Sequence, residues 1–380
     1  MRTLIVATAC LMASVSLMAQ RHKLTINAET PEGALLQQIG TEADATKKME
    51  LMEQFTEKFP KHEAAAWVYA QLAPAYLKAN QPDKSMGAAE KLLALDPGDV
   101  EIAHGGLKAA ETKKDPDAIR KWAVITSDAA RKMVASPQPK EEDEVEEWKR
   151  LVDFSKQVDT YTEYSMYAAA LQTTDARKRI ELFETIEKRN PQSQYVQQSQ
   201  EAYLAALTMA GEKAKATQVA EKAAASPNAG EDVILAAASG AYEAKNFEKA
   251  SGYSEKLIAL LNSKPKPETM AEADWQKKKN LMLGIAYWMN GVIQSNAGRW
   301  AEADKTLRTA LPLIEENKAL AAEALFHLGL ANYKLGDKPQ DSKRILEAVQ
   351  FNQRCAAIPG PFQAQARKNL AAIRSQYQIK

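Results

Sequence analysis

Apolar side chains recur along the chain at helical spacing, and small residues recur with them at fixed places. The stretch from Ala66 to Asp99 shows the pattern, with Leu72, Leu77, Ala89 and Leu92 at steps of helical turns. Such spacing predicts amphipathic helices that each bury one face. Alternating runs of valine, isoleucine and threonine, which would indicate strands, are absent after the first 19 residues. The pattern therefore predicts an all-helical protein.

The order of small, aromatic and glycine positions returns at a step of about 34 residues. The units that show it best begin at Ala66, Glu231, Gly284 and Ala322. Only small residues let two helix backbones come close, so Gly291 and Gly329 mark predicted helix crossings. Gly298 marks a predicted turn, because glycine adopts positive φ without steric cost. Helix pairs of this length bury their apolar faces by stacking on their neighbours.

This order of parts resembles the tetratricopeptide repeat, from about Glu29 onward. The resemblance implies an all-α fold, a right-handed α-solenoid of stacked antiparallel helix pairs in a tetratricopeptide-like superhelix. Another helical repeat family of similar length is the alternative. Between Val100 and Thr160 the signature positions do not align, although Asp115–Val134 still has the spacing of an amphipathic helix. The last helix, from about Pro361 to Tyr377, is expected to cap the array.

The N-terminus has the plan of a secretory signal peptide. A positive start at Met1-Arg2 precedes the apolar run Leu4–Met18, and we expect cleavage after Ala19. A retained N-terminal helix is one alternative. Lipidation at Cys10 is another, disfavoured by the short apolar run before it. We therefore expect the protein to be secreted across the inner membrane, and the mature chain to be periplasmic or envelope-associated.

Two proline-containing breaks interrupt the array, Ser136–Pro139 and Asn262–Thr269. Proline ends the helix before the first break, and the acidic run Glu141–Glu147 suits the N-terminus of the next helix. A docking site for a basic partner is the alternative for that run. The breaks divide the chain into a signal peptide (1–19), N-terminal repeats (20–136), central divergent repeats (137–264), and C-terminal repeats with the capping helix (265–380).

Composition and motifs point away from several function classes. The 50 basic and 49 acidic residues give no strong net charge, so nothing favours nucleic acid. No stretch after residue 19 is long and apolar enough to span a membrane. The four histidines lie far apart, and no phosphate loop or nucleophile elbow appears. We therefore predict no enzyme activity, no cofactor and no metal site, and a buried rather than reactive Cys355.

The resemblance implies that the first helix of each pair lines a concave groove, where peptides or partner helices bind. The positions that it assigns to this groove are Trp67, Leu77, Lys78, Leu235, Tyr242, Ile285, Trp288, Asn296, Phe326, Leu330 and Tyr333. Both tryptophans and both tyrosines have the alternative of packing between repeats. Some members of the family grip a carboxylate with lysine and asparagine, but the matching places hold Ala70, Pro74, Trp288, Val292, Phe326 and Leu330. An apolar groove favours a helix or an extended peptide instead.

The resulting hypothesis is a non-enzymatic exported scaffold. It would mediate protein–protein interaction through the concave groove, in cell-envelope assembly or maintenance. A periplasmic binder of a small ligand or glycan in the same groove is the alternative. An enzyme built on a helical solenoid is a third possibility, and it predicts a cluster of perturbed acids in one cleft.

Overall fold

The computed structural model describes residues 27–338 and 340–379, so the predicted signal peptide and Cys10 lie outside them. Every regular element in these described ranges is a helix, which confirms the predicted all-α fold. The helices up to α9 are α1 (Pro31–Thr41), α2 (Ala45–Lys58), α3 (Ala65–Lys78), α4 (Pro82–Leu95), α5 (Val100–Lys113), α6 (Pro116–Val134), α7 (Glu142–Gln172), α8 (Ala176–Arg189) and α9 (Gln194–Gln198). The remaining helices are α10 (Gln200–Met209), α11 (Lys213–Ala224), α12 (Glu231–Glu243), α13 (Phe247–Ser263), α14 (Glu272–Asn296), α15 (Trp300–Ile314), α16 (Lys318–Asp337), α17 (Ser342–Ala356) and α18 (Gln363–Tyr377).

Contacts divide the chain into two compact units, one that ends at Ala206 and one that begins at Leu207. This division falls inside the predicted central block, 137–264. The predicted limits of that block fall in the loops before α7 and after α13. The arrangement of three repeat blocks stays a prediction.

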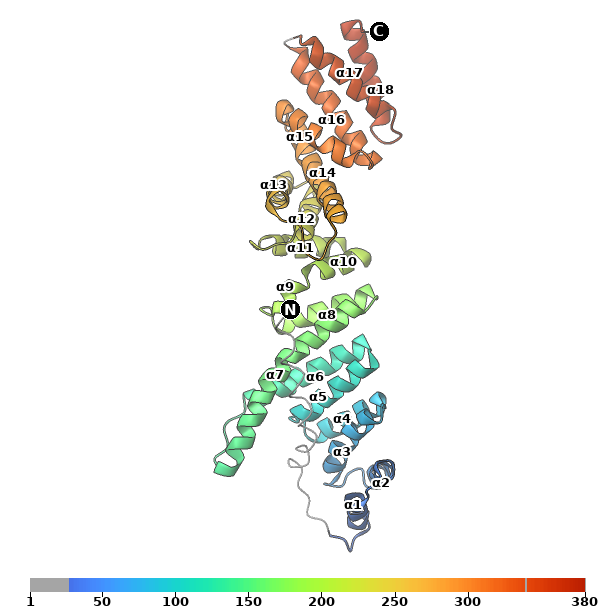
Figure 1. The fold of residues 1–380 in the computed structure, drawn as a ribbon, viewed down its shortest axis with the longest axis vertical. Helices are drawn as coiled ribbons and strands as arrows, with labels where there is room; N and C mark the ends of the chain where they lie inside the picture. Colours follow the sequence, from blue (N-terminus) through green and yellow to red (C-terminus); the bar gives the residue numbers. More distant parts are fainter. Residues whose placement is uncertain (1–26, 339, 380) are drawn as a thin grey trace. The chain divides into compact units, whose positions relative to one another are not determined.

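Helices of the N-terminal unit stack in chain order, as Figure 1 shows for α3 to α6. Each packs on the next, and the first helices of neighbouring pairs also touch, α3 with α5 and α5 with α7. The stretch between Val100 and Thr160 follows the same arrangement although its signature positions do not align. Helix α6 confirms the helix predicted at Asp115–Val134, with Asp115 as its N-cap.

Pairs α12/α13, α14/α15 and α16/α17 form the C-terminal unit in the same way, with α12 touching α14 and α14 touching α16. Helix α18 packs on α17 and buries Ala366 and Ile373, as a capping helix should. Cys355 is fully buried, and its thiol donates to the Ala322 carbonyl at 3.2 Å. This confirms the predicted core position of Cys355.

A residue with positive φ recurs between the first and second helix of a pair. These residues are Asn80, Lys114, Gly211, Lys245, Gly298 and Gln340. The left-handed conformation reverses the chain within a few residues, at no steric cost for glycine and at a modest one for other residues. Gly298 confirms a predicted turn. Lys114 and Lys245 also adopt positive φ, but lysine is not a residue type that indicates a turn in a sequence. The recurring turn marks the repeat in the backbone itself.

Glycines stand where the paired helices cross. A Cβ atom on Gly291 would lie 2.5 Å from Leu307 Cγ, and one on Gly329 would lie 2.5 Å from Asn352 Nδ2. These distances are too short for any side chain, so the two helices of each pair pack directly against the glycine. The predicted crossings at both positions are confirmed.

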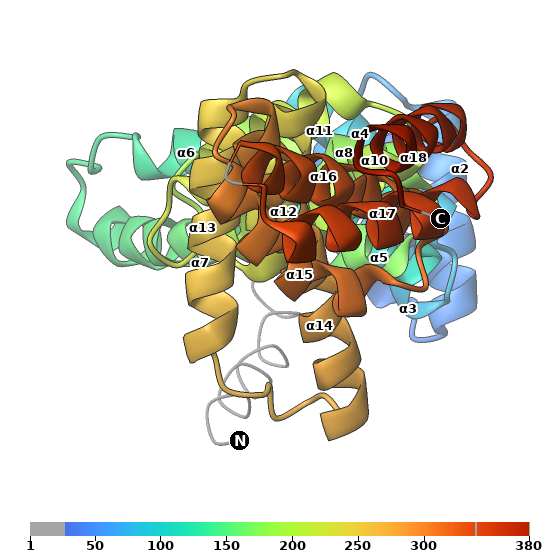
Figure 2. The same cartoon turned by 90° about the horizontal axis from the view of Figure 1, so that it is seen from above.

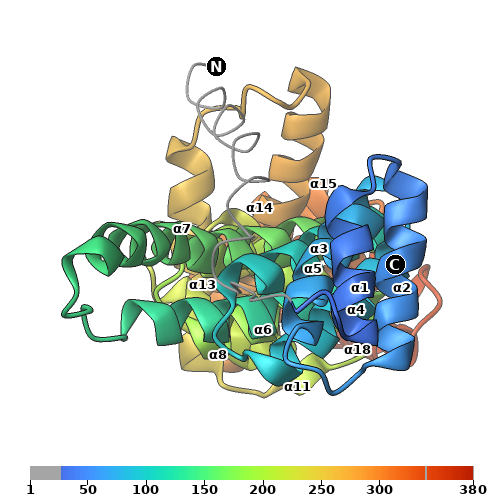
Figure 3. The ribbon, with the colours of Figure 1, turned by 90° about the horizontal axis from the view of Figure 1, so that it is seen from below.

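Each proline-containing break lies at the end of a long helical hairpin. Helices α6 and α7 run side by side around residues 135–141 in Figure 3, and α13 and α14 do so around residues 264–271 in Figure 2. Trp148 Nε1 donates to Ser136 Oγ at 3.0 Å across the first hairpin. Trp275, 2% exposed, lies in the first turn of α14 beside the second break, with Lys264 Nζ 6.0 Å from the centroid of its ring. The acidic run begins α7 as predicted, and Arg150 bridges Glu147 and Glu101 there.

Candidate functional site

The first helices of the C-terminal unit bring part of the predicted groove together. Side chains from α12, α14 and α16 pack on one apolar cluster. Those of the predicted residues that join it are Leu235, Tyr242, Ile285, Trp288 and Phe326. We call these five side chains the first-helix face. All of them except Trp288 are half-buried, so they keep some surface uncovered.

Trp288 lies in the core of this face, with 8% of its surface exposed. Its ring packs against Tyr242 at a centroid distance of 5.1 Å and an interplanar angle of 54°. Among the described residues its buried Nε1 has no hydrogen-bond acceptor. Tilted contact like that between Tyr242 and Trp288 is a favoured arrangement for two aromatic rings. Trp288 therefore supports Tyr242 from beneath and offers little surface of its own.

Phe326 extends the face toward the capping helix. Its ring lies 5.2 Å from that of Phe362, the residue that precedes α18. The next residue, His327, is buried, and its Nδ1 lies 2.8 Å from Ser295 Oγ on α14. Burial lowers the pKa of His327 to about 4, so the ring is neutral at pH 7. The α14–α16 contact is thus uncharged at its centre.

One carboxylate interrupts the apolar character of this region. Glu323 is half-buried on α16, and burial raises its pKa above the usual range. No hydrogen bond or ion pair joins it to any described residue. Burial, together with the charge of Glu323, raises the pKa of Tyr242 to about 12. Glu323 and the Tyr242–Trp288 pair therefore belong to the same patch.

The other predicted groove residues do not join this face. Tyr333 packs in a separate cluster with α17 and α18, and its hydroxyl donates to Gln376 at 3.1 Å. Asn296 is exposed at the end of α14, and Leu330 is half-buried. In the N-terminal unit Trp67 and Leu77 are half-buried and Lys78 is exposed. A groove role for all of these residues stays a prediction.

A row of aromatic rings in the N-terminal unit was not predicted as a site. It runs along α7, where the ring centroids of Tyr161 and Tyr164 lie 5.9 Å apart, and continues to Tyr195 on α9, whose ring centroid lies 6.1 Å from that of Tyr164. Tyr164 is 48% exposed, unusual for so large a ring. The tyrosines at 161, 164 and 167 in YTEYSMY follow a helical spacing that could have signalled it.

A closed polar network underlies this row. Glu111 accepts from Tyr161 at 2.7 Å and from Ser165 at 2.6 Å, and its other oxygen pairs with Lys108 at 3.1 Å. His104 packs edge-on against Tyr161. Burial, with the charge of Lys108, lowers the pKa of His104 to about 4. Since both carboxylate oxygens are engaged, the network fits a role in holding α5 to α7.

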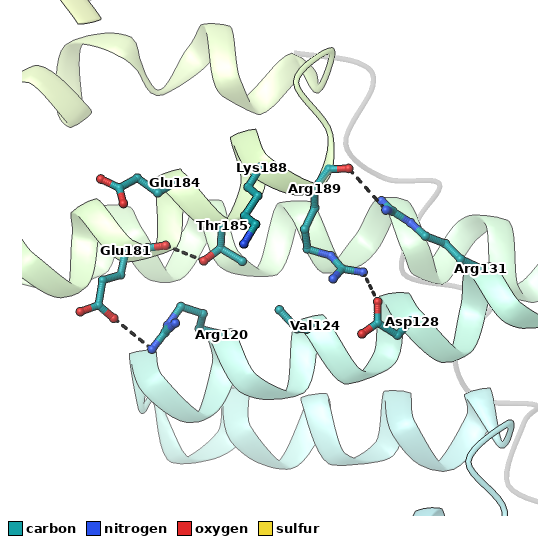
Figure 4. Close-up of a pocket in the computed structure, with 9 residues that line it drawn as sticks. All are labelled: Arg120, Val124, Asp128, Arg131, Glu181, Glu184, Thr185, Lys188 and Arg189. Atoms are coloured by element: carbon teal, nitrogen blue, oxygen red, sulfur yellow. Dashed lines mark hydrogen bonds and ion pairs between the residues drawn. The ribbon is translucent and has the colours of Figure 1, made fainter. Parts of the chain in front are cut away.

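A cavity of about 530 Å³ lies between α6 and α8, on the second-helix side of their pairs (Figure 4). Its walls are charged, but most of the charges pair with side chains of the opposite charge. Arg120 bonds Glu181 at 3.0 Å, and Arg189 bonds Asp128 at 2.6 Å. Arg131, also in the wall, pairs with Asp159 at 3.0 Å. The first two ion pairs bridge α6 and α8, the third joins α6 to α7, and together they leave the cavity without a dominant charge for a ligand.

Among residues 27–338 and 340–379, no group of three histidine, cysteine, aspartate or glutamate side chains is placed to hold a metal ion. In the same residues, no helix has the length and the apolar character needed to cross a bilayer.

No protein-family model matches the chain, and no curated protein matches it in sequence. Solved structures similar to it include the P58(IPK) TPR domain, with 13% identity, 92% of this chain and 100% of that chain covered, and a TM-score of 0.25. Yeast Tom70 has 13% identity, coverage of 95% and 68%, and a TM-score of 0.29. The assembly chaperone of RpL4 (Acl4) has 14% identity, coverage of 83% and 100%, and a TM-score of 0.25.

The helix pairs and their recurring turn residue within each unit are what make the chain a tetratricopeptide-like helical repeat.

Proposed function

We propose that this protein is a non-enzymatic scaffold that binds another protein through the first-helix face of its C-terminal unit. The observation that carries the proposal is the convergence of Leu235, Tyr242, Ile285 and Phe326, from three successive first helices, on one partly uncovered apolar cluster. Aromatic side chains in such a place supply contact area at low entropic cost. An amphipathic helix or an extended segment fits a face of this composition.

In-cell photocrosslinking tests this proposal. A photoreactive residue replaces Phe326, and a control variant carries it at Leu346, an exposed position on the second helix α17. We expect one dominant partner protein from position 326, lost when Tyr242→Ala and Ile285→Ala are added. Equal capture at both positions, or capture that survives these substitutions, would refute the proposed face.

Export to the cell envelope is the finer part of the proposal, and it rests on the N-terminal sequence. Gln20 follows the predicted cleavage site at Ala19. N-terminal sequencing of the protein purified from cell-envelope fractions is expected to begin at Gln20. A chain that begins at Met1 and fractionates with the cytosol would refute export, and a lipid on Cys10 would replace cleavage at Ala19 with anchoring.

The aromatic row of the N-terminal unit favours a second candidate function, the binding of a glycan. Sugar rings stack on exposed aromatic faces, and Tyr164 offers such a face beside Tyr195. A thermal shift with cell-wall glycan fragments, abolished in Tyr164→Ala, would favour this candidate. Fragments that leave the melting temperature of the wild-type protein unchanged would refute it.

A further inference from the structure

We propose that the segment bound to the first-helix face places an arginine side chain against Glu323. This inference rests on the proposed function and specifies the chemistry of the partner. Glu323 lies on α16, three residues before Phe326, within the surface that the partner would cover. The predicted contact is an ion pair at the edge of an aromatic patch.

Other poorly exposed carboxylates of the same unit show why Glu323 is unusual. Glu231, whose side chain is 5% exposed, pairs with Lys264 and with Lys278. Asp304, whose side chain is 8% exposed, pairs with Arg308 and Arg344. A charge removed from water is costly unless a cation or a set of donors replaces the water. In these two cases the chain supplies its own cations.

Glu323 has no such compensation among the described residues. The nearest ionisable neighbour on its own helix, His327, is neutral because it is buried. On α12 the Tyr242 hydroxyl is close enough for its pKa to respond to the charge of Glu323, and this hydroxyl carries no positive charge. The patch therefore holds a negative charge in an apolar setting, and a cation from a partner complements it.

Arginine suits this place better than lysine does. Its guanidinium is weakly hydrated, binds a carboxylate through two N–H groups, and stacks on aromatic rings. The half-buried ring of Tyr242, which packs on Trp288 at a centroid distance of 5.1 Å, supplies such a ring in the same patch. Cation–π contact adds to the ion pair where water is excluded. Arginine is also among the residues that most often dominate binding energy at interfaces.

The experiment begins with a random peptide library selected on the full-length protein. The best arginine-containing peptide and its analogue with citrulline, a neutral isostere, are then measured by calorimetry. We expect Glu323→Gln to weaken the arginine peptide about 30-fold and to leave the citrulline analogue unchanged. The matched control, Glu316→Gln, removes an exposed carboxylate and should change neither affinity.

The outcomes separate the two proposals. Selected peptides that lack arginine, or that bind Glu323→Gln and wild type equally, overturn the role of Glu323 and leave the scaffold proposal standing. Failure to select any peptide sensitive to Phe326→Ala overturns both. The melting temperature gives an independent readout, because Glu323→Gln removes an uncompensated charge and should not lower stability. A lower melting temperature would mean that Glu323 serves the fold and not a partner.

Discussion

At the scale of single residues, the absence of a side chain is as informative as its presence. Gly291 and Gly252 are both helical glycines of the C-terminal unit, but only Gly291 meets a neighbouring helix, at Leu307. A methyl group at Gly252 finds open space, whereas one at Gly291 has no room. An alanine at Gly252 therefore tests helix propensity alone, whereas an alanine at Gly291 also tests the close packing of α14 on α15.

Gly291→Ala is therefore expected to lower the free energy of unfolding by about 1–3 kcal/mol, because the helices must move apart or Leu307 must leave its rotamer. Gly252→Ala should raise it by up to about 1 kcal/mol, since alanine favours the helix. Urea unfolding of both variants measures the difference. Equal effects would show that α14 and α15 do not cross closely at Gly291.

Asp304 gives a second prediction at this scale. Burial raises its pKa, but hydrogen bonds from Arg344 (2.7 Å), Asn332 (2.6 Å) and Arg308 (2.8 Å) outweigh burial and lower it below the usual range. The folded pKa thus lies below the unfolded value of about 3.9. The stabilisation is present above that value and is lost as the pH falls through the folded pKa.

Asp304→Asn is accordingly expected to cost about 2–3 kcal/mol of unfolding free energy at pH 7, because it removes the charge of a buried carboxylate that accepts hydrogen bonds from Arg344, Arg308 and Asn332. The difference from wild type should shrink as the pH falls below about 4. Glu302→Gln, which removes a surface ion pair with Arg299, serves as the control and should change stability by less than about 0.5 kcal/mol. A difference that does not vary with pH would contradict the role assigned to the Asp304 charge.

At the scale of helices, periodicity made most of the fold predictable and little of the site. Gly291, Gly329 and Gly298 showed where helices cross and turn, because those positions tolerate few residue types. The burial of Trp288 depends on its contact with the ring of Tyr242, which lies 46 residues earlier in the chain. Helical spacing does not predict a contact between residues so far apart. Glu323 was missed for the same reason, since only the packed neighbours reveal that it has no cation.

Ion pairs join the hairpin of α13 and α14 to the start of α12, close to the loop of the hairpin. Glu231, at the start of α12, bonds Lys264 at the end of α13 and Lys278 in α14. Glu231→Gln should therefore accelerate amide exchange in residues 264–275, because it removes an ion pair with both sides of the hairpin. Hydrogen–deuterium exchange measures this, with Glu268→Gln, at an exposed loop position, as the control. Unchanged exchange in that segment would show that the Glu231 ion pairs do not hold the hairpin.

At the scale of the whole molecule, contacts run mainly between neighbours in the chain. Within each unit most helices pack on the next one, and the contacts divide the chain at Ala206 and Leu207. In such an array, stability is approximately a sum of repeat terms and nearest-neighbour terms. A destabilising substitution in one unit should therefore lower the stability of that unit and leave the stability of the other nearly unchanged.

Two matched core truncations test this locality. Leu107 in α5 and Leu307 in α15 are both fully buried, and truncation to alanine costs about 2–5 kcal/mol at such sites. We expect Leu107→Ala to accelerate native-state amide exchange only before Ala206, and Leu307→Ala only after Leu207. Exchange that rises equally in both units would mean that they unfold as one cooperative body. Local unfolding would instead allow a partner bound at the first-helix face to stabilise the C-terminal unit alone, since a ligand stabilises only the state that it binds.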